Sequence, residues 1–135
     1  MVIKVPGIEP GETFALVESL DLFPTLAELA GLDAPPDLHG LSLAPVLNDR
    51  LTTVKDVAIS QFNRLGAYAY SMRTDQYRYT EWVEVDGAVV YRELYDLRAD
   101  PEESVNIGGN GENSVLMDAL ANQLRSNSTG LLRLR

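Results

Sequence analysis

The sequence contains no cysteine and a single histidine, His39. The absence of cysteine excludes disulfides, thiolate metal ligands and a cysteine nucleophile. A lone histidine also disfavours a multi-histidine metal site and a Ser-His-Asp triad. His39 lies in a proline-rich loop, where a surface or locally hydrogen-bonded role is the favoured interpretation and contact with a ligand or an adjoining domain is the alternative.

Positive charge and long apolar runs are scarce as well. Lysine and arginine number 11 against 20 aspartates and glutamates, for a net charge of −9 and a pI of about 4.4. Clustered basic residues bind polyanions, so this balance disfavours nucleic acid and anionic membrane surfaces. No apolar run approaches the roughly 20 residues of a membrane span, and the first residues lack signal-peptide architecture. We expect no nucleic acid and no membrane as partners, and the compartment stays open.

The length of 135 residues suits one domain that buries its own core. Hydrophobic residues make up 45% and charged residues 23%, as in soluble globular proteins, so wholesale disorder is not expected. Residues 1–5 read as one strand without a neighbour, and the sheet to which it belongs is expected to lie outside this chain.

The first half predicts a helix over Leu22–Ala30. Asp21 suits the N-cap, Pro24 falls in the first turn and Gly31 suits the position after the last turn. The spacing gives one apolar face, formed by Leu22, Leu26, Leu29 and Ala30. Residues 33–40 are expected to be a loop, and a short helical turn is expected at residues 43–47.

The second half changes to a period of two residues, typical of strands. We predict strands over residues 57–62, 67–73, 77–85 and 88–94, which form an antiparallel sheet of about four strands. Asp86 and Gly87 separate the last two and suit a two-residue type I′ hairpin. A final helix, capped by Asn113 or Ser114, then packs an apolar side on the sheet: Leu116, Met117, Leu120 and Leu124. The fold class is therefore α+β, with a flexible tail over residues 126–135.

Carboxylates are plentiful but do not form a recognisable metal site. Asp96, Asp100, Glu102 and Glu103 lack the spacing of a calcium loop, so a solvated acidic turn is the favoured interpretation. The stretch Gly108–Gly111 lacks the lysine of a phosphate loop and is taken as a flexible connector. The aromatic residues on the strands favour cross-strand packing over a carbohydrate platform.

Three arginines stand out in an acidic chain, since guanidinium binds sulfate and carboxylate groups in a bidentate manner. Arg78 lies within a strand and is expected to pair internally with a carboxylate such as Asp75, Glu81 or Glu93. Arg64 and Arg73 lie next to loops, where either substrate contact or an internal pair is open.

Three segments together resemble the sulfatase family. Residues 17–31 (VESLDLFPTLAELAG) resemble the helix that follows the sulfatase catalytic domain, and residues 38–47 (LHGLSLAPVL) resemble the segment that comes next. Residues 93–97 (ELYDL), with Asp100–Glu103 and Asn106, are similar to the closing stretch. Residues 60–64 (SQFNR), 70–75 (YSMRTD) and 77–82 (YRYTEW) look like the iduronate-2-sulfatase branch. The resemblance covers residues 1–125 in order.

The resemblance implies a division of the chain and a set of site residues. Residues 1–12 would be a remnant strand and linker of a catalytic domain, residues 13–125 the C-terminal subdomain and residues 126–135 a tail. Arg64, Tyr70 and Arg73 are the residues expected to touch substrate. Full-length relatives are usually exported, to the periplasm, the cell exterior or the lysosome.

The same resemblance shows what the chain does not contain. Sulfatases use a Cys or Ser in a C/S-x-P-S-R motif, converted to formylglycine, beside a calcium ion, and the sequence has no such motif. We therefore expect no catalytic residue, metal ligand or cofactor in this chain, with calcium and formylglycine only in a full-length homologue. Sulfate-ester cleavage needs a nucleophile, a proton donor and a cation, so the isolated chain is predicted to be inactive.

Three functions remain open from the sequence. The first is the C-terminal part of a sulfatase acting on sulfated glycans, contributing scaffold and a wall of the substrate cleft. The second is a free-standing carbohydrate-binding or protein-interaction module that holds a sulfated or acidic sugar. The third is a structural partner that docks on a separately encoded catalytic chain. A surface that would normally face the catalytic domain could also drive self-association.

Overall fold

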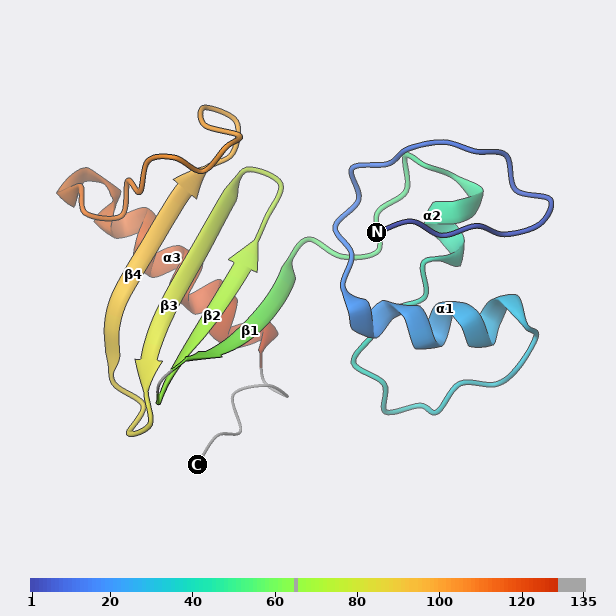
Figure 1. Ribbon diagram of the computed structural model, residues 1–135, viewed down its shortest axis with the longest axis horizontal. Coiled ribbons are helices and arrows are strands. Elements are labelled where there is room, and N and C mark those ends of the chain that lie inside the picture. Colours follow the sequence, from blue (N-terminus) through green and yellow to red (C-terminus); the bar gives the residue numbers. More distant parts are fainter. Residues whose placement is uncertain (65, 129–135) are drawn as a thin grey trace. The chain divides into compact units, whose positions relative to one another are not determined.

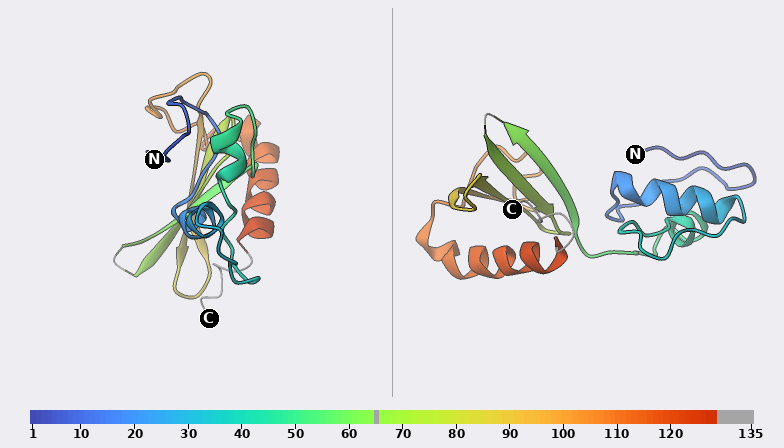
Figure 2. Two further views of the ribbon diagram at one scale, coloured as in Figure 1. Left: turned by 90° about the vertical axis from the view of Figure 1, so that its right-hand side faces the viewer. Right: turned by 90° about the horizontal axis from the view of Figure 1, so that it is seen from below.

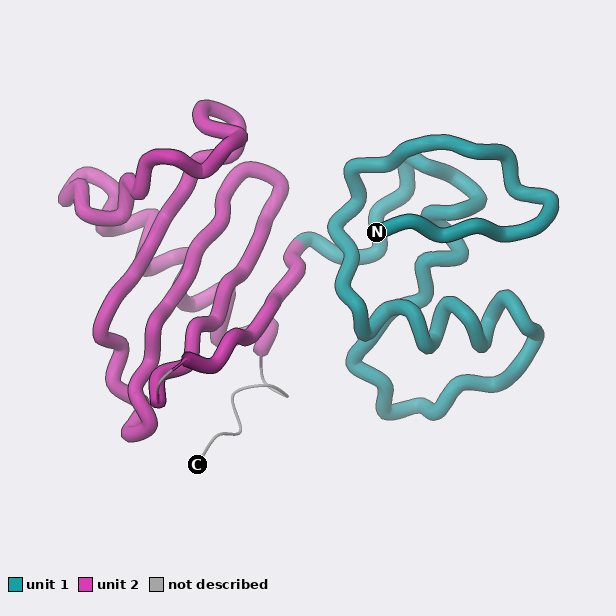
Figure 3. The backbone as a smooth tube through the Cα atoms, in the orientation of Figure 1, with its two compact units in different colours: residues 1–56 teal, residues 57–135 magenta. Residues whose placement is uncertain are grey.

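The computed structural model describes residues 1–64 and 66–128 and divides into two compact units, Met1–Asp56 and Val57–Arg135 (Figure 3). This corrects the expectation of one compact domain from chain length. Among the described residues, the main buried apolar cluster contains only Val57 and residues after it. The buried apolar residues of unit 1, among them Leu43 and Val46, lie outside that cluster. The boundaries expected at residues 12 and 125 stay predictions.

Unit 1 contains a 3-10 turn, η1 (Ser19–Asp21), and two helices, α1 (Leu22–Leu29) and α2 (Ala44–Asn48) (Figure 1). Both helical predictions are confirmed to within about a residue. Gly31 has a φ of +68°, where a residue without a side chain is favoured. Its N–H donates to Glu28 O, and the Leu32 N–H donates to Ala27 O, which together end α1 in a Schellman motif.

The predicted apolar face of α1 is not buried within its unit. Leu26 is 62% exposed and Leu29 40% exposed, whereas Pro24 and Thr25 are buried. Residues 1–5 form no strand and have no ladder partner among the described residues, so the expected N-terminal strand is absent from this structure. A strand is defined by its partner, and the partner sheet was expected to lie outside this chain.

Unit 2 is a four-stranded antiparallel sheet in the order β1-β2-β3-β4, as Figure 1 shows. The strands are β1 (Ala58–Arg64), β2 (Ala67–Arg73), β3 (Tyr77–Glu84) and β4 (Val89–Asp96). A 3-10 turn, η2 (Gly111–Asn113), leads into the final helix, α3 (Ser114–Asn127). The predicted α+β class is confirmed.

One face of this sheet packs against α3 (Figure 2). The register places Met72, Tyr79 and Leu94 side by side on β2, β3 and β4, and all three are fully buried. The apolar side of α3 completes this core with Met117, Leu120, Ala121 and Leu124. Because side chains alternate across a strand, the intervening residues form an opposite face, which we call the open face.

The β3–β4 turn differs from the predicted type I′ hairpin. Gly87 has a φ of +91°, but Asp86 does not have the positive φ that type I′ requires. The Gly87 N–H donates to Glu84 O and the Glu84 N–H donates to Ala88 O. The bonds and the glycine conformation fit a three-residue loop, a type I turn followed by a glycine bulge. Asp86 contributes by accepting the Ala88 N–H.

The cap of the last helix also differs from the prediction. Neither Asn113 nor Ser114 caps α3 with its side chain; instead Asn110 accepts the Glu112 N–H one turn earlier, at the start of η2. The helix extends through Asn127, two residues into the expected tail. Ser128 follows and is fully buried, and residues 129–135 lie outside the described residues.

Candidate functional site

The sequence-predicted residues Arg64 and Arg73 lie at opposite ends of the β1–β2 pair. Arg73 pairs with Ala58, and Arg64 pairs with Ala67. Six residue steps along β1 separate the two ends, about 20 Å at the rise of an extended strand. Both arginines have open-face register positions, but they cannot hold the same sulfate group.

Tyr70, the third predicted residue, lies on the other face of the sheet. It pairs with Gln61 and Glu81, belongs to the core cluster beneath α3 and is only 3% exposed. Burial raises the pKa of its phenol, with a smaller contribution from Tyr68. The structure therefore does not bring Tyr70 together with Arg64 or Arg73.

A neighbour for Arg73 comes instead from β3. Arg73 and Arg78 are directly opposite each other in the β2–β3 register. Such pairs have Cβ atoms about 5 Å apart, and like charges in this arrangement repel. Arg78 donates from Nε to Glu103 Oε2 at 2.6 Å, whereas Arg73 is exposed and has no ion pair among the described residues. Glu103 thus compensates Arg78 and leaves the charge of Arg73 available.

The internal pair predicted for Arg78 is confirmed, with a different carboxylate from those proposed. Glu103 comes from the acidic turn that was interpreted as merely solvated. Its backbone has a φ of +54°, which is unfavourable for a residue with a side chain. Asp100 holds this turn by accepting the Ser104 hydroxyl and the Val105 N–H. The turn is therefore ordered and delivers a carboxylate to the open face.

Aromatic residues on the open face share another carboxylate. Trp82 Nε1 donates to Glu93 Oε1 at 2.7 Å, and the Tyr95 hydroxyl donates to Glu93 Oε2 at 2.9 Å. Burial, followed by the bond and charge of Glu93, raises the pKa of Tyr95 to about 12. The Trp82 bond crosses from β3 to β4, as the predicted cross-strand packing implies, whereas Tyr95 and Glu93 both belong to β4. Tyr95 is directly opposite Arg78.

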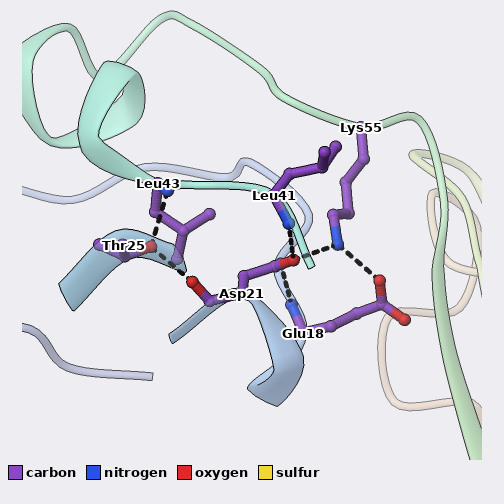
Figure 4. A network of polar contacts seen from close by, with 6 residues as sticks. All are labelled: Glu18, Asp21, Thr25, Leu41, Leu43 and Lys55. Carbon is purple, nitrogen blue, oxygen red and sulfur yellow. Dashed lines mark hydrogen bonds and ion pairs between the residues drawn. The ribbon is translucent and has the colours of Figure 1, made fainter. Parts of the chain in front are cut away.

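Unit 1 is organised around a buried carboxylate that the sequence did not reveal (Figure 4). Asp21 has no exposed surface and accepts the N–H groups of Glu18 and Leu41. Lys55 Nζ lies 2.7 Å from Asp21 Oδ1 and 2.5 Å from Glu18 Oε2. Lys55 is 34 positions from Asp21, and no local pattern signals such a pair.

Thr25 and Gly40 hold the segment around residues 40–43 against the start of the helical region of unit 1. The Thr25 hydroxyl donates to Asp21 O at 2.6 Å and accepts the Leu43 N–H at 2.8 Å. A Cβ at position 40 would lie 2.0 Å from Leu20 O, so only glycine fits there. The segment that resembles a sulfatase motif is thus held by buried polar groups of unit 1.

The described residues contain no assembled catalytic set. No group of three or more His, Cys, Asp or Glu residues could hold a metal in this part of the chain, and His39 is exposed. Within residues 1–64 and 66–128, no helix has the length and apolar character needed to cross a membrane. Within these ranges, no nucleophile lies beside both a base and a cation site.

The described part of the chain is an α+β fold in two compact units. The chain belongs to the sulfatase C-terminal family described as "N-sulphoglucosamine sulphohydrolase, C-terminal", which matches residues 1–129. The predicted sulfatase relationship is confirmed.

Named relatives support the same family. The chain is 32% identical to arylsulfatase K of Xenopus laevis over 120 residues, covering 81% of this chain and 22% of the relative. It is 31% identical to the delta 4,5-hexuronate-2-O-sulfatase of Bacteroides thetaiotaomicron over 121 residues, covering 83% of this chain and 24% of the relative.

A solved structure has the same fold over most of the chain. The neighbouring structure is that of a protein in complex with its substrate, D-glucosamine-2-N,6-O-disulfate. It matches this chain with a TM-score of 0.68 and 27% sequence identity. The match covers 81% of this chain and 23% of the solved one. The chain therefore spans about a fifth to a quarter of the proteins it matches.

Proposed function

We propose that the chain serves as the C-terminal part of a sulfatase acting on sulfated glycans and forms scaffold and one wall of the substrate cleft. The chemistry would come from a catalytic domain outside these residues. Family membership and the small share of each relative that the chain covers support this proposal. The observation that carries the substrate part is the exposed Arg73 beside the compensated Arg78.

The open face suits an anionic sugar for two reasons. Arg73 presents a guanidinium whose planar donors match a sulfate or carboxylate group. Its repulsion with Arg78 would be relieved when an anion binds between them. Arg64, at the far end of β1, would contact a different part of the ligand. The closer assignment to the iduronate-2-sulfatase branch belongs to this proposal, and the hexuronate-2-O-sulfatase relative supports it.

The catalytic domain would have a surface to dock on in unit 1. Leu22, Phe23, Leu26 and Leu29 of α1 are exposed although their spacing is that of a buried helix face. Burial of such a stripe stabilises by about 25 cal/mol per Å² of apolar area. Without the catalytic domain, the same stripe would drive self-association of the chain.

Calcium and formylglycine do not fit the residues present. The sequence has no cysteine and no Ser-x-Pro-Ser-Arg segment, and the described part holds no cluster of metal ligands. Both groups would belong to the catalytic domain of an enzyme that we expect to be exported.

A chimaera tests this proposal. The corresponding segment of the Bacteroides thetaiotaomicron hexuronate-2-O-sulfatase would be replaced by this chain. We expect the chimaera to cleave its sulfated substrate, and the variants R73A and R64A to raise KM more than they lower kcat. The purified chain by itself should not turn over an aryl sulfate with or without calcium. A folded but inactive chimaera, or turnover by the chain alone, would contradict the proposal.

The second candidate function is a free-standing module for acidic sugars, favoured by the same open face. It predicts heat of binding when the isolated chain is titrated with sulfated or uronic-acid oligosaccharides. Flat calorimetric traces at millimolar ligand would exclude it.

A further inference from the structure

A pocket of about 200 Å³ lies on the opposite face of the sheet, beside the last turns of α3. Its walls come from β2, β3, the β3–β4 turn and α3, and include Tyr68, Tyr70, Glu81, Val83, Leu124 and Arg125. At about 30 Å³ per water, this volume corresponds to about seven waters. It is smaller than a typical pocket for a drug-sized ligand, and it suits one small molecule or sugar ring.

The strand register builds the floor of this pocket. Tyr70 is directly opposite Glu81, and Tyr68 is directly opposite Val83. All four have register positions on the face that packs against α3, so two phenols, one carboxylate and one apolar side chain meet in a single patch. None of these residues belongs to the open face.

Glu81 is 4% exposed, and within the described residues only one of its two carboxylate oxygens accepts a hydrogen bond. Its Oε1 accepts the Tyr79 hydroxyl at 2.7 Å and Arg125 Nη2 at 3.0 Å, and Arg92 Nε lies 3.8 Å from the same oxygen. No described residue donates to Oε2. An ionised carboxylate accepts at both oxygens, so Glu81 retains unused acceptor capacity.

Tyr70 has the same property. Its ring is buried, and its hydroxyl has no hydrogen bond with any described residue. No fully buried polar side-chain atom lacks a partner in the described part of the chain. Tyr70 lines the pocket, so its hydroxyl, which has no partner among the described residues, is placed to bond a molecule held there. A phenol hydroxyl can both donate and accept, so a molecule in the pocket could exchange hydrogen bonds with it.

The charges of the pocket select the class of ligand. Glu81 and Glu84 contribute two carboxylates, and Arg125, the cation in the lining, is engaged with Glu81. Arg92 also lies near Glu81, whereas Glu84 has no ion pair among the described residues, so the carboxylate of Glu84 would repel an anion. Hydroxyl groups, in contrast, can donate to a carboxylate oxygen and exchange bonds with a phenol, while the aromatic rings cover the apolar side of a sugar ring.

We propose that this pocket binds a neutral, hydroxyl-rich molecule of the size of one sugar ring, such as an unsulfated monosaccharide unit. This site is separate from the open face and does not depend on sulfatase activity. The Tyr70 hydroxyl and Glu81 Oε2 form its polar floor, and Arg125 holds the other oxygen of Glu81.

Titration of the ¹⁵N-labelled full chain with neutral monosaccharides, followed by amide chemical shifts, tests the proposal. Glucose, galactose and N-acetylglucosamine are the probes, and glucuronate is the anionic comparison. We expect shifts confined to the lining residues, among them Tyr68, Val83, Gly87 and Leu124, and weaker shifts with glucuronate. Tyr70→Phe keeps the ring and removes one hydrogen bond, so affinity should fall by about 2- to 12-fold.

Tyr77→Phe is the matched control, because Tyr77 also borders the core and does not line the pocket. It should leave the affinity unchanged. The shift map of the unaltered chain stands independently if Tyr70→Phe fails to fold. Absence of shifts at the lining residues, tighter binding of glucuronate, or equal affinities of the native chain and a folded Tyr70→Phe would each overturn the proposal.

Discussion

Lys55 Nζ lies 2.7 Å from Oδ1 of Asp21, a carboxylate with no exposed surface. Glu18 provides a second carboxylate to the same ammonium, and two backbone N–H groups donate to Asp21. A charge buried this completely persists only when it is paired and hydrogen-bonded. This pair therefore connects the start of the helical region of unit 1 with its last residues.

Lys55→Met should destabilise unit 1 by about 3–5 kcal/mol, the usual cost of leaving one member of a buried pair alone. The measurement is native-state hydrogen exchange at the Leu41 N–H, which donates to Asp21. Arg98→Met is the control, because the Arg98–Asp75 pair is 65% and 85% exposed and should contribute at most about 1 kcal/mol. Equal effects of the two substitutions would contradict the role assigned to Lys55.

Gly40→Ala should destabilise unit 1 by about 1–3 kcal/mol or more, in the range of overpacked cores. The new Cβ would lie 2.0 Å from Leu20 O, a backbone atom that cannot rotate away. Gly109→Ala is the control, since a Cβ there meets nothing within 4 Å. Urea melts that follow a probe in unit 1 measure the difference, and a Gly40→Ala melt that coincides with the native one would refute this explanation of the glycine.

Thr25→Val keeps the shape of the side chain and removes its hydroxyl. Leu43 N–H then has no acceptor in a buried position, which costs about 1–3 kcal/mol. Exchange of the Leu43 amide should accelerate accordingly. Thr53→Val, at an exposed threonine, should change stability by less than about 0.5 kcal/mol. Unchanged protection of Leu43 in Thr25→Val would show that another group satisfies this amide.

The raised pKa of Tyr95 makes unit 2 sensitive to alkali. The folded-state pKa of about 12 exceeds the ordinary value of 10.0, so folding favours the protonated phenol. This contribution to stability is complete below pH 10 and is lost as the pH rises toward 12. Tyrosinate absorbance of the native chain minus that of Tyr95→Phe should show this late titration.

Glu93→Gln tests the cause of that shift. Desolvation of Tyr95 would persist, while the charge of the carboxylate would be removed and its bond with the phenol weakened. The pKa of Tyr95 should therefore fall from about 12 toward 10 without reaching it. An unchanged late titration would assign the whole shift to burial.

The strands and the helix that covers them were predictable because each has a clear period. Strand β2 has the bounds that its sequence predicted, and the apolar side of α3 packs on the sheet as expected. Alternation along β2 also contained the signal that separates Tyr70 from Arg73: the two are three positions apart and so belong to opposite faces. The family resemblance grouped them as residues that touch substrate, which stays a prediction, and strand parity places them on opposite faces.

Long-range polar pairs could not be predicted in the same way. Arg78 pairs with Glu103, which lies 25 positions away in a turn where Glu103 itself has an unfavourable positive φ.

The Asp86-Gly87 dipeptide is compatible with more than one hairpin loop, and the structure adopts the one in which only glycine has a positive φ. The alternation of residues along a strand indicates which face of the sheet each residue occupies. A specific ion pair depends instead on the conformation of the loop that carries the second residue.

The order of the strands across the sheet is the same as their order along the chain. Each pair of neighbouring strands is joined by a short connection, so its hydrogen bonds can form from that connection outward without a distant segment of the chain. During synthesis on the ribosome, the hairpins could form one after another, and α3 would pack against the sheet last. Because the contacts of this sheet lie within one continuous segment, the segment could be joined to a different domain with its strand pairing unchanged.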